Sequence, residues 1–200
     1  MDPVNLYRAF KEESHAKDFV ELGKFRLGSL EGYRYVENRC IRDAREGFAS
    51  FTDSRGIKGG GIEIYPVYLL CTSGASVDLS HLRRKYGEWV VLIRNPRKLL
   101  EQLSAATPTN TNMGLSKTTE LEKVLYTKDE TNPTITHDSP EAVKLAYIQK
   151  LPRFHADCEY RYVVRAKTAG GRRPSCLHYD LGGPLPYLEL LGSVPEGGKP

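Results

Sequence analysis

The longest apolar run in the chain extends only from Tyr65 to Cys71, and Pro66 interrupts it. A helix that crosses a bilayer needs about 20 consecutive apolar residues, so this run cannot cross one. A short apolar run bounded by polar residues is typical of a buried strand. The chain must therefore build its core from several short segments, and we expect no membrane partner.

Composition favours one globular unit. The 200 residues are 40% hydrophobic and 27% charged, which is enough to bury one full core. We expect a single domain over residues 1–193 and a flexible tail over residues 194–200. The net charge of +4 (29 basic minus 25 acidic residues) is mild, so an anionic ligand is compatible with it but not required.

Cysteine usage and the first residues both favour a cytoplasmic protein. Residues 1–8 carry neither a cationic segment nor an apolar segment of the kind found in leader peptides. The cysteines are scattered and form no CxxC pair, which argues against a zinc ribbon or a disulfide scaffold; they are Cys40, Cys71, Cys158 and Cys176. We expect reduced thiols and no bound metal.

Hydrophobic periodicity predicts a mixed α/β chain. Helical spacing of apolar residues predicts helices over residues 12–22, 96–103 and 140–149. Alternating or branched apolar residues predict strands over residues 5–10, 24–28, 62–72, 89–93, 121–126 and 160–166, with one or two more within 177–191. The composition between residues 105 and 117, rich in Thr, Asn, Pro and Gly, predicts a long loop.

The densest polar group in the sequence lies between Arg153 and Arg161, where a loop enters a predicted strand. In extended backbone, residues two apart share a face, so Asp157, Glu159 and Arg161 can project together. A carboxylate at such a position can bind a sugar hydroxyl or stabilise a cationic transition state. The alternative is an exposed sheet edge on which Glu159 and Arg161 pair only with each other.

Two further places could carry chemistry. Tyr7 and Arg8 lie on the first predicted strand, and a guanidinium there can bind a pyrophosphate or ribose. Thr72 and Ser73 close the most apolar strand, where hydroxyls can brace a sugar or a carboxylate. Taken separately, each is better explained as an outer face or a turn. Arg42 lies in a highly charged stretch, residues 39–47, that could line a cleft and bind substrate.

In chain order, these groups resemble the signature of the ADP-ribosyltransferases, which is an Arg, a Ser-Thr-Ser triplet and a Glu-x-Glu motif. The corresponding parts are Arg8, Cys71-Thr72-Ser73 and Asp157-Cys158-Glu159. Cys71 replaces the first Ser, and Asp157 replaces the first Glu. The surrounding sequence also resembles a group of poorly characterised bacterial proteins, many encoded near phage-defence genes.

The resemblance implies an α+β fold with two small packed mixed or antiparallel sheets, flanking helices and NAD in the cleft between them. It implies that Arg8 contacts the diphosphate or nicotinamide ribose, that Ser73 orients the catalytic carboxylate, and that Glu159 binds the ribose 2′-hydroxyl. NAD would be a substrate, since no glycine-rich dinucleotide fingerprint is present. The acceptor would be a protein or a nucleic acid, and a toxin or anti-phage effector could have a cognate antitoxin.

Two other function classes remain open. One is an RNA- or DNA-binding or ribonuclease-type module that uses tyrosines for stacking and arginines for phosphates, namely Arg39, Arg42, Arg45, Arg153, Arg161, Arg165, Arg172 and Arg173. The other is a non-enzymatic interaction protein that binds through the charged stretch at residues 39–46.

Overall fold

The structure is a computed structural model of the chain. It describes residues 5–34, 51–52, 58–59, 66–110, 117–127, 130–131, 139–166 and 174–192. Within these residues, no helix is long and apolar enough to cross a membrane.

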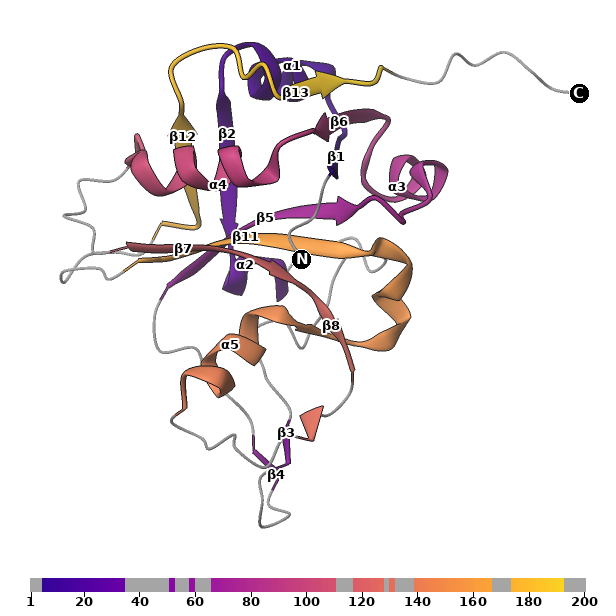
Figure 1. The fold of residues 1–200 in the computed structure, drawn as a ribbon, viewed down its shortest axis with the longest axis vertical. Coiled ribbons are helices and arrows are strands. Elements are labelled where there is room, and N and C mark those ends of the chain that lie inside the picture. Colours follow the sequence, from indigo (N-terminus) through magenta and orange to yellow (C-terminus); the bar gives the residue numbers. More distant parts are fainter. Residues whose placement is uncertain are drawn as a thin grey trace, which may run out of the picture.

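The described residues form helices and strands that are mixed along the chain (Figure 1). The helices are α1 (Glu13–Glu21), α2 (Leu30–Arg34), α3 (Leu79–Tyr86), α4 (Pro96–Ala105), α5 (Pro140–Ile148) and the 3-10 helix η1 (Pro152–Asp157). The longer strands are β1 (Leu6–Phe10), β2 (Lys24–Ser29), β5 (Val67–Gly74), β6 (Trp89–Ile93), β7 (Lys117–Lys123), β11 (Glu159–Ala166), β12 (Cys176–Asp180) and β13 (Leu188–Leu190). Two-residue strands are β3 (Phe51–Thr52), β4 (Lys58–Gly59), β8 (Leu125–Tyr126), β9 (Glu130–Thr131) and β10 (Gln149–Lys150).

The eight longer strands form one antiparallel sheet that branches at β5. One edge of β5 pairs with β11 from Val67 to Ser73, and β11 pairs in turn with β7. The other edge of β5 has two partners: β2 pairs near its start, at Tyr68 and Leu69, and β1 pairs near its end, at Ser73 and Gly74. The prediction of a mixed α/β protein is therefore confirmed, with a large antiparallel sheet.

The alternating side chains of β5 and β11 separate two cores. Leu70 and Tyr162 belong to a core that includes residues of α1 and α4, whereas Leu69 and Val163 pack in another core against α5. Successive residues of a strand point to opposite faces, so helices cover both faces of this part of the sheet. A third, smaller core joins Leu82 of α3 to the β1–β6 side.

Local signals explain where several elements begin and end. Asn95 and Ser139 cap α4 and α5 by accepting hydrogen bonds from backbone N–H groups, and a proline follows each cap. Gly23 ends the α1 segment with φ 65°, a left-handed conformation that glycine adopts at little cost. The predicted helices 12–22, 96–103 and 140–149 are confirmed to within two residues at each end.

Three predictions of local structure were wrong or incomplete. β7 begins at Lys117, four residues before the predicted strand, because pairing with β11 along its whole length outweighs its polar sequence. Helix α3 was not predicted, although Asp78 caps it through its side chain. The segment from Pro152 to Asp157 is a 3-10 helix, where a loop had been expected to lead into extended backbone at Asp157.

Candidate active site

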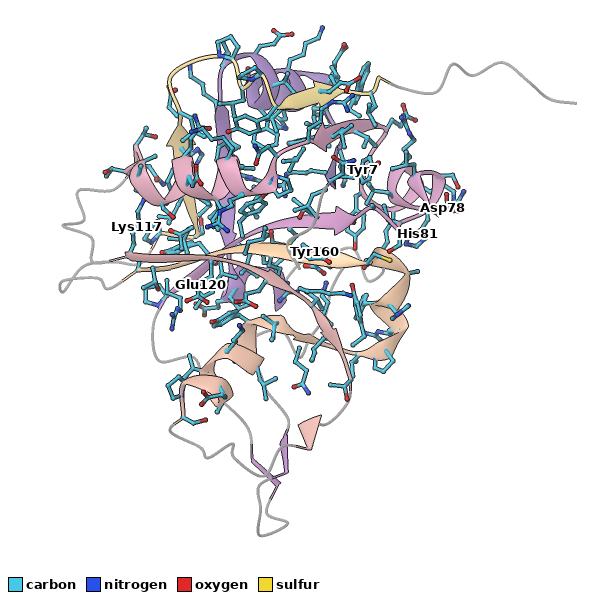
Figure 2. All side chains as sticks on the ribbon, in the orientation of Figure 1. Tyr7, Asp78, His81, Lys117, Glu120 and Tyr160 are labelled. Atoms are coloured by element: carbon cyan, nitrogen blue, oxygen red, sulfur yellow. The ribbon has the colours of Figure 1, made fainter. Side chains whose placement is uncertain are left out.

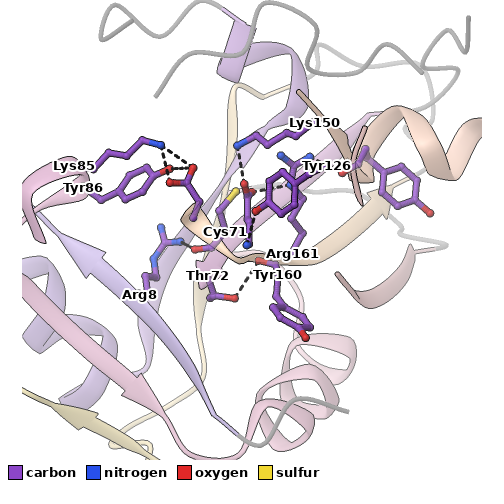
Figure 3. A network of polar contacts seen from close by, with 12 residues as sticks. Arg8, Cys71, Thr72, Lys85, Tyr86, Tyr126, Lys150, Tyr160 and Arg161 are labelled. Carbon is purple, nitrogen blue, oxygen red and sulfur yellow. Dashed lines mark hydrogen bonds and ion pairs between the residues drawn. The ribbon is translucent and has the colours of Figure 1, made fainter. Parts of the chain in front are cut away.

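A cavity of about 180 Å³ lies where β1, β5 and β11 meet, next to α3. The register of these strands places Tyr7 opposite Ser73, and Ser73 opposite Glu159, in one row across the sheet. The cavity is lined by Tyr7, Arg8, Ala9, Tyr33, Cys71, Thr72, Ser73, Leu82, Tyr86, Lys150, Asp157, Glu159 and Arg161. Five separate stretches of the sequence therefore line one space, and Figure 3 shows polar contacts among residues of this region.

Arg8 occupies the branch in the sheet. Between the stretches that pair with β1 and β2, the β5 edge at residues 70–72 has no strand partner among the described residues. The Arg8 Nη1 atom donates a hydrogen bond of 2.6 Å to the Cys71 carbonyl oxygen on this edge. The Arg8 Nε atom is buried and has no hydrogen-bond partner within the part of the chain that the structure describes. Burial lowers the pKa of this guanidinium.

Glu159 lies between two cations. Lys150 Nζ donates to its Oε2 at 2.6 Å, and Arg161 Nε donates to its Oε1 at 2.8 Å. The side chains of all three residues are at most 7% exposed. Burial by itself would raise the pKa of Glu159, but the charges of Arg161 and Lys150 outweigh burial and hold the pKa below its usual range. Glu159 is therefore ionised at neutral pH.

The small β8–β10 sheet positions this group from the other side. β8 and β10 are parallel, and their register places Lys150 opposite Tyr126. The Glu159 backbone N–H donates a hydrogen bond of 2.6 Å to the Tyr126 hydroxyl oxygen. The same pair of short strands thus contacts both the side chain and the backbone of Glu159.

Asp157 is held by α3. Lys85 Nζ donates to both carboxylate oxygens at 2.7 Å, and the Tyr86 hydroxyl donates to Oδ2 at 2.6 Å. His81 Nε2 lies 3.1 Å from Oδ1. Burial, followed by the charge of Asp157, raises the pKa of Tyr86 and keeps its hydroxyl protonated.

The backbone turns sharply between the two carboxylates. Cys158 has φ 46° and ψ 44°, the left-handed region, and it is the single non-glycine residue with positive φ among those described. Non-glycine residues in this region cost about 1–3 kcal/mol and cluster at functional sites. The expectation that Asp157 and Glu159 share a strand face was wrong, because Asp157 ends η1 and β11 begins at Glu159. Both nevertheless line the cavity.

Phe154 lies between the two ion-paired groups. Its ring centroid is 5.2 Å from Lys85 Nζ and 5.0 Å from Lys150 Nζ, and Arg153 also stacks on it at 4.8 Å. Cations are attracted to the face of an aromatic ring within about 6 Å. One buried ring therefore contacts both lysines that neutralise the two carboxylates.

Seven of the eight predicted site residues line this cavity, namely Tyr7, Arg8, Thr72, Ser73, Asp157, Glu159 and Arg161. Arg42 lies outside the described residues. The alternative of an exposed edge at Glu159 and Arg161 is wrong: the two do pair, but they are 4% and 1% exposed. The Thr72 hydroxyl donates to the Tyr160 carbonyl oxygen at 3.0 Å, so it joins β5 to β11.

Sequence reasoning missed Lys85, Tyr86, Tyr126 and Lys150. Lys150 directly follows the predicted helix 140–149 and precedes a proline by two residues, and nothing local marks it as buried. The three residues of α3 that contact Asp157 follow i, i+4 and i+5 spacing, which would have been informative only if the helix had been predicted. The described residues contain no cluster of three or more His, Cys, Asp or Glu side chains suited to a metal ion.

Comparison with known proteins does not classify the chain: no family model matches it, and neither a curated protein nor a solved structure is significantly similar to it.

Proposed function

We propose that the protein is an NAD-consuming enzyme of the ADP-ribosyltransferase type, with the cavity at the branch of the sheet as its active site. The observation that carries the proposal is convergence. Arg8, the Thr72–Ser73 pair and the Asp157–Glu159 pair are far apart in sequence, yet all line this one cavity. The divergence of β1 and β2 along the β5 edge also supports a cleft of the split-sheet kind.

Glu159 has the properties that the proposed chemistry needs. When the bond between C1′ of the ribose and the nicotinamide nitrogen breaks, positive charge develops on the ribose ring. A fixed, buried carboxylate stabilises such a charge more strongly than one in water. Lys150 and Arg161 keep Glu159 ionised and fix its orientation, and it would accept a hydrogen bond from the ribose 2′-hydroxyl.

Arg8 is the natural anion ligand of the cavity. Of the three cations that line it, Lys150 and Arg161 are bonded to Glu159, whereas Arg8 is bonded to a neutral carbonyl. Its guanidinium would bind the diphosphate or the nicotinamide ribose. Because cavities that enclose a drug-sized ligand measure about 300–1,000 Å³, this smaller one would enclose the nicotinamide ribose and leave the adenosine half outside.

Nicotinamide release from NAD tests the proposal. We expect release by the wild-type protein, and a loss of at least about 100-fold in Glu159→Gln, because the variant lacks the charge that stabilises the transition state. Glu189→Gln is the matched control, since it removes an exposed carboxylate that pairs with Arg94 outside the cavity. Circular dichroism establishes that each variant is folded.

Arg8→Lys gives a second test that leaves the buried ion pairs intact. We expect it to raise the KM for NAD more than it lowers kcat, because lysine keeps the charge but loses the planar donors. Absence of nicotinamide release from the folded wild-type protein, together with absence of NAD binding in calorimetry, contradicts the proposed function. A toxin or anti-phage role would then lose its chemical basis.

A further inference from the structure

Both carboxylates of the cavity are already neutralised by cations. Glu159 is bonded to Lys150 and Arg161, and Asp157 receives hydrogen bonds on both oxygens from Lys85 as well as one from Tyr86. A carboxylate offers about four lone-pair sites, and His81 occupies a further position at Asp157. An acceptor with a guanidinium or ammonium group would thus meet cations already in place. This argues against arginine or lysine side chains as acceptors.

Basic side chains continue from the cavity to the surface along α3 and η1. We define the α3–η1 rim as His81, Arg84, Lys85, Arg153 and His155. His81 and Lys85 are on one helical face because they are four residues apart, and Arg84 lies beside them, three residues from His81. Figure 2 shows His81 on α3, on the side of the molecule where η1 also lies. Contact of Lys85 and Arg153 with the same Phe154 ring brings the two elements together.

The exposed members of the rim are available to phosphates. Arg84 and Arg153 are exposed, and neither lies within ion-pair distance of a carboxylate among the described residues; Arg84 donates a hydrogen bond of 3.2 Å to Ser80 Oγ, and Arg153 stacks on Phe154. Helix α3 has three basic residues in its last turn and no acidic residue within its bounds. Exposed arginines clustered on one surface are typical contacts for the phosphates of a nucleic-acid backbone.

The size of the cavity selects single strands over duplexes. A cavity of about 180 Å³ is too small to hold a base pair, and enzymes that modify a base first remove it from the stack. Tyr126 and the exposed His155 form an edge-to-face pair, with ring centroids 5.2 Å apart, next to Glu159. Aromatic rings in such a place stack on unpaired bases.

We propose that the acceptor is a single-stranded nucleic acid whose backbone binds across the α3–η1 rim. This inference rests on the proposed function. The C1′–N bond of NAD would break with its electron pair passing to nicotinamide, which leaves as a neutral molecule. A new bond would form between C1′ and a nucleophilic oxygen or nitrogen of the nucleic acid, whose proton passes to solvent.

Binding is measured without NAD, so that it is independent of catalysis. The probe is a fluorescein-labelled single strand of about 20 nucleotides, longer than the site of one small domain, as RNA and as DNA. The test variant is Arg84→Gln/Arg153→Gln, and the matched control is Arg97→Gln/Lys98→Gln on α4, which lies across the molecule from α3 (Figure 1). Fluorescence anisotropy is recorded over a series of salt concentrations.

We expect the test variant to weaken binding and to reduce the slope of log Kd against log salt by about 0.7 for each lost phosphate contact, or about 1.4 in total. The control should retain the wild-type slope. Nicotinamide release without acceptor should be the same in all three proteins, while transfer of ADP-ribose to the nucleic acid should fall in the test variant alone.

Three outcomes would overturn the inference. The first is nicotinamide release by a wild-type protein that binds neither strand. The second is an equal loss of binding in test and control variants, and the third is transfer of label from NAD to proteins but not to nucleic acid in a cell lysate. If nucleic acid binds through the α3–η1 rim but no nicotinamide is released, the proposed binding surface is supported and the proposed enzyme activity is contradicted.

Discussion

Glu159 lies in a buried ion-pair group on which the stability of the fold depends. It lies with Lys150 and Arg161 in a place that is almost closed to solvent, and each of its oxygens has a charged donor. Removing one partner of a buried ion pair is costly because the remaining charges lose their compensation. The cavity and the stability of the protein therefore depend on the same side chain.

Replacing Glu159 by Gln should lower the free energy of unfolding by about 3–5 kcal/mol at neutral pH. The exposed ion pair between Arg94 and Glu189 serves as the comparison: Glu189→Gln should lower the free energy of unfolding by less than about 1 kcal/mol. Urea denaturation followed by circular dichroism measures both. Equal losses in the two variants would show that the buried pairs contribute no more than the surface pair.

The stability difference between wild type and Glu159→Gln should depend on pH. The folded-state pKa of Glu159 lies below its ordinary value of 4.5, so its contribution to stability is complete above that value and is lost as pH falls through the folded-state pKa. The difference in stability between wild type and Glu159→Gln should be constant near neutral pH and shrink below about pH 4. Denaturation curves at a series of pH values test this, and a difference that grows on acidification contradicts it.

Among the elements, the junction of η1 and β11 determines how the two carboxylates face the cavity. The left-handed Cys158 turns the chain so that Asp157 meets α3 while Glu159 begins the strand. Gly74 lies against this junction: its N–H donates to the Cys158 carbonyl oxygen at 2.8 Å, and a Cβ atom there would come within 2.8 Å of the Tyr160 ring. A side chain at this position would therefore displace the Tyr160 ring.

Cys158→Val should destabilise the protein by about 1–3 kcal/mol, because a β-branched residue is strongly disfavoured at positive φ. Cys71→Val is the matched control: Cys71 lies in β5, where extended backbone suits a β-branched side chain. Thermal denaturation of the two variants gives the comparison. If both lose the same stability, side-chain packing rather than backbone conformation explains the effect.

At the scale of the whole molecule, a ligand bound at the branch of the sheet should stabilise the entire fold. The cavity touches β1, β5 and β11 as well as α3, so a ligand there contacts elements from all three cores. A ligand that binds only the native state stabilises it by about 2.7 kcal/mol at 100 times its Kd.

A hydrolysis-resistant NAD analogue should therefore raise Tm, by about 2–4 °C for each kcal/mol in a chain of this size. The rise should be smaller in Arg8→Lys than in Arg94→Lys, which alters an exposed arginine paired with Glu189. Differential scanning calorimetry at several analogue concentrations provides the measurement. An identical rise in both variants would place the NAD site away from Arg8.

The sequence by itself determined the local elements and most of the candidate site. Apolar periodicity, caps and prolines act over a few residues, so α1, α4, α5 and the core of β11 could be predicted. The candidate site residues could be selected because polar groups are dense between Arg153 and Arg161, and because Arg8, Thr72, Ser73 and the two carboxylates resemble, in chain order, the signature of the ADP-ribosyltransferases. Their convergence on one cavity was an expectation that only the register of three strands could establish.

The tertiary structure decided which cations neutralise each carboxylate and how the backbone turns between them. Lys85 is 72 residues from Asp157 in sequence, and Arg8 is 63 residues from Cys71. No local pattern encodes such pairings, because they depend on how β5 changes partners from β2 to β1 and on where α3 packs. Asp157 and Glu159 look alike in the sequence, but their tertiary contacts differ. Asp157 binds side chains of α3, whereas Glu159 is an ionised group held between Lys150 and Arg161.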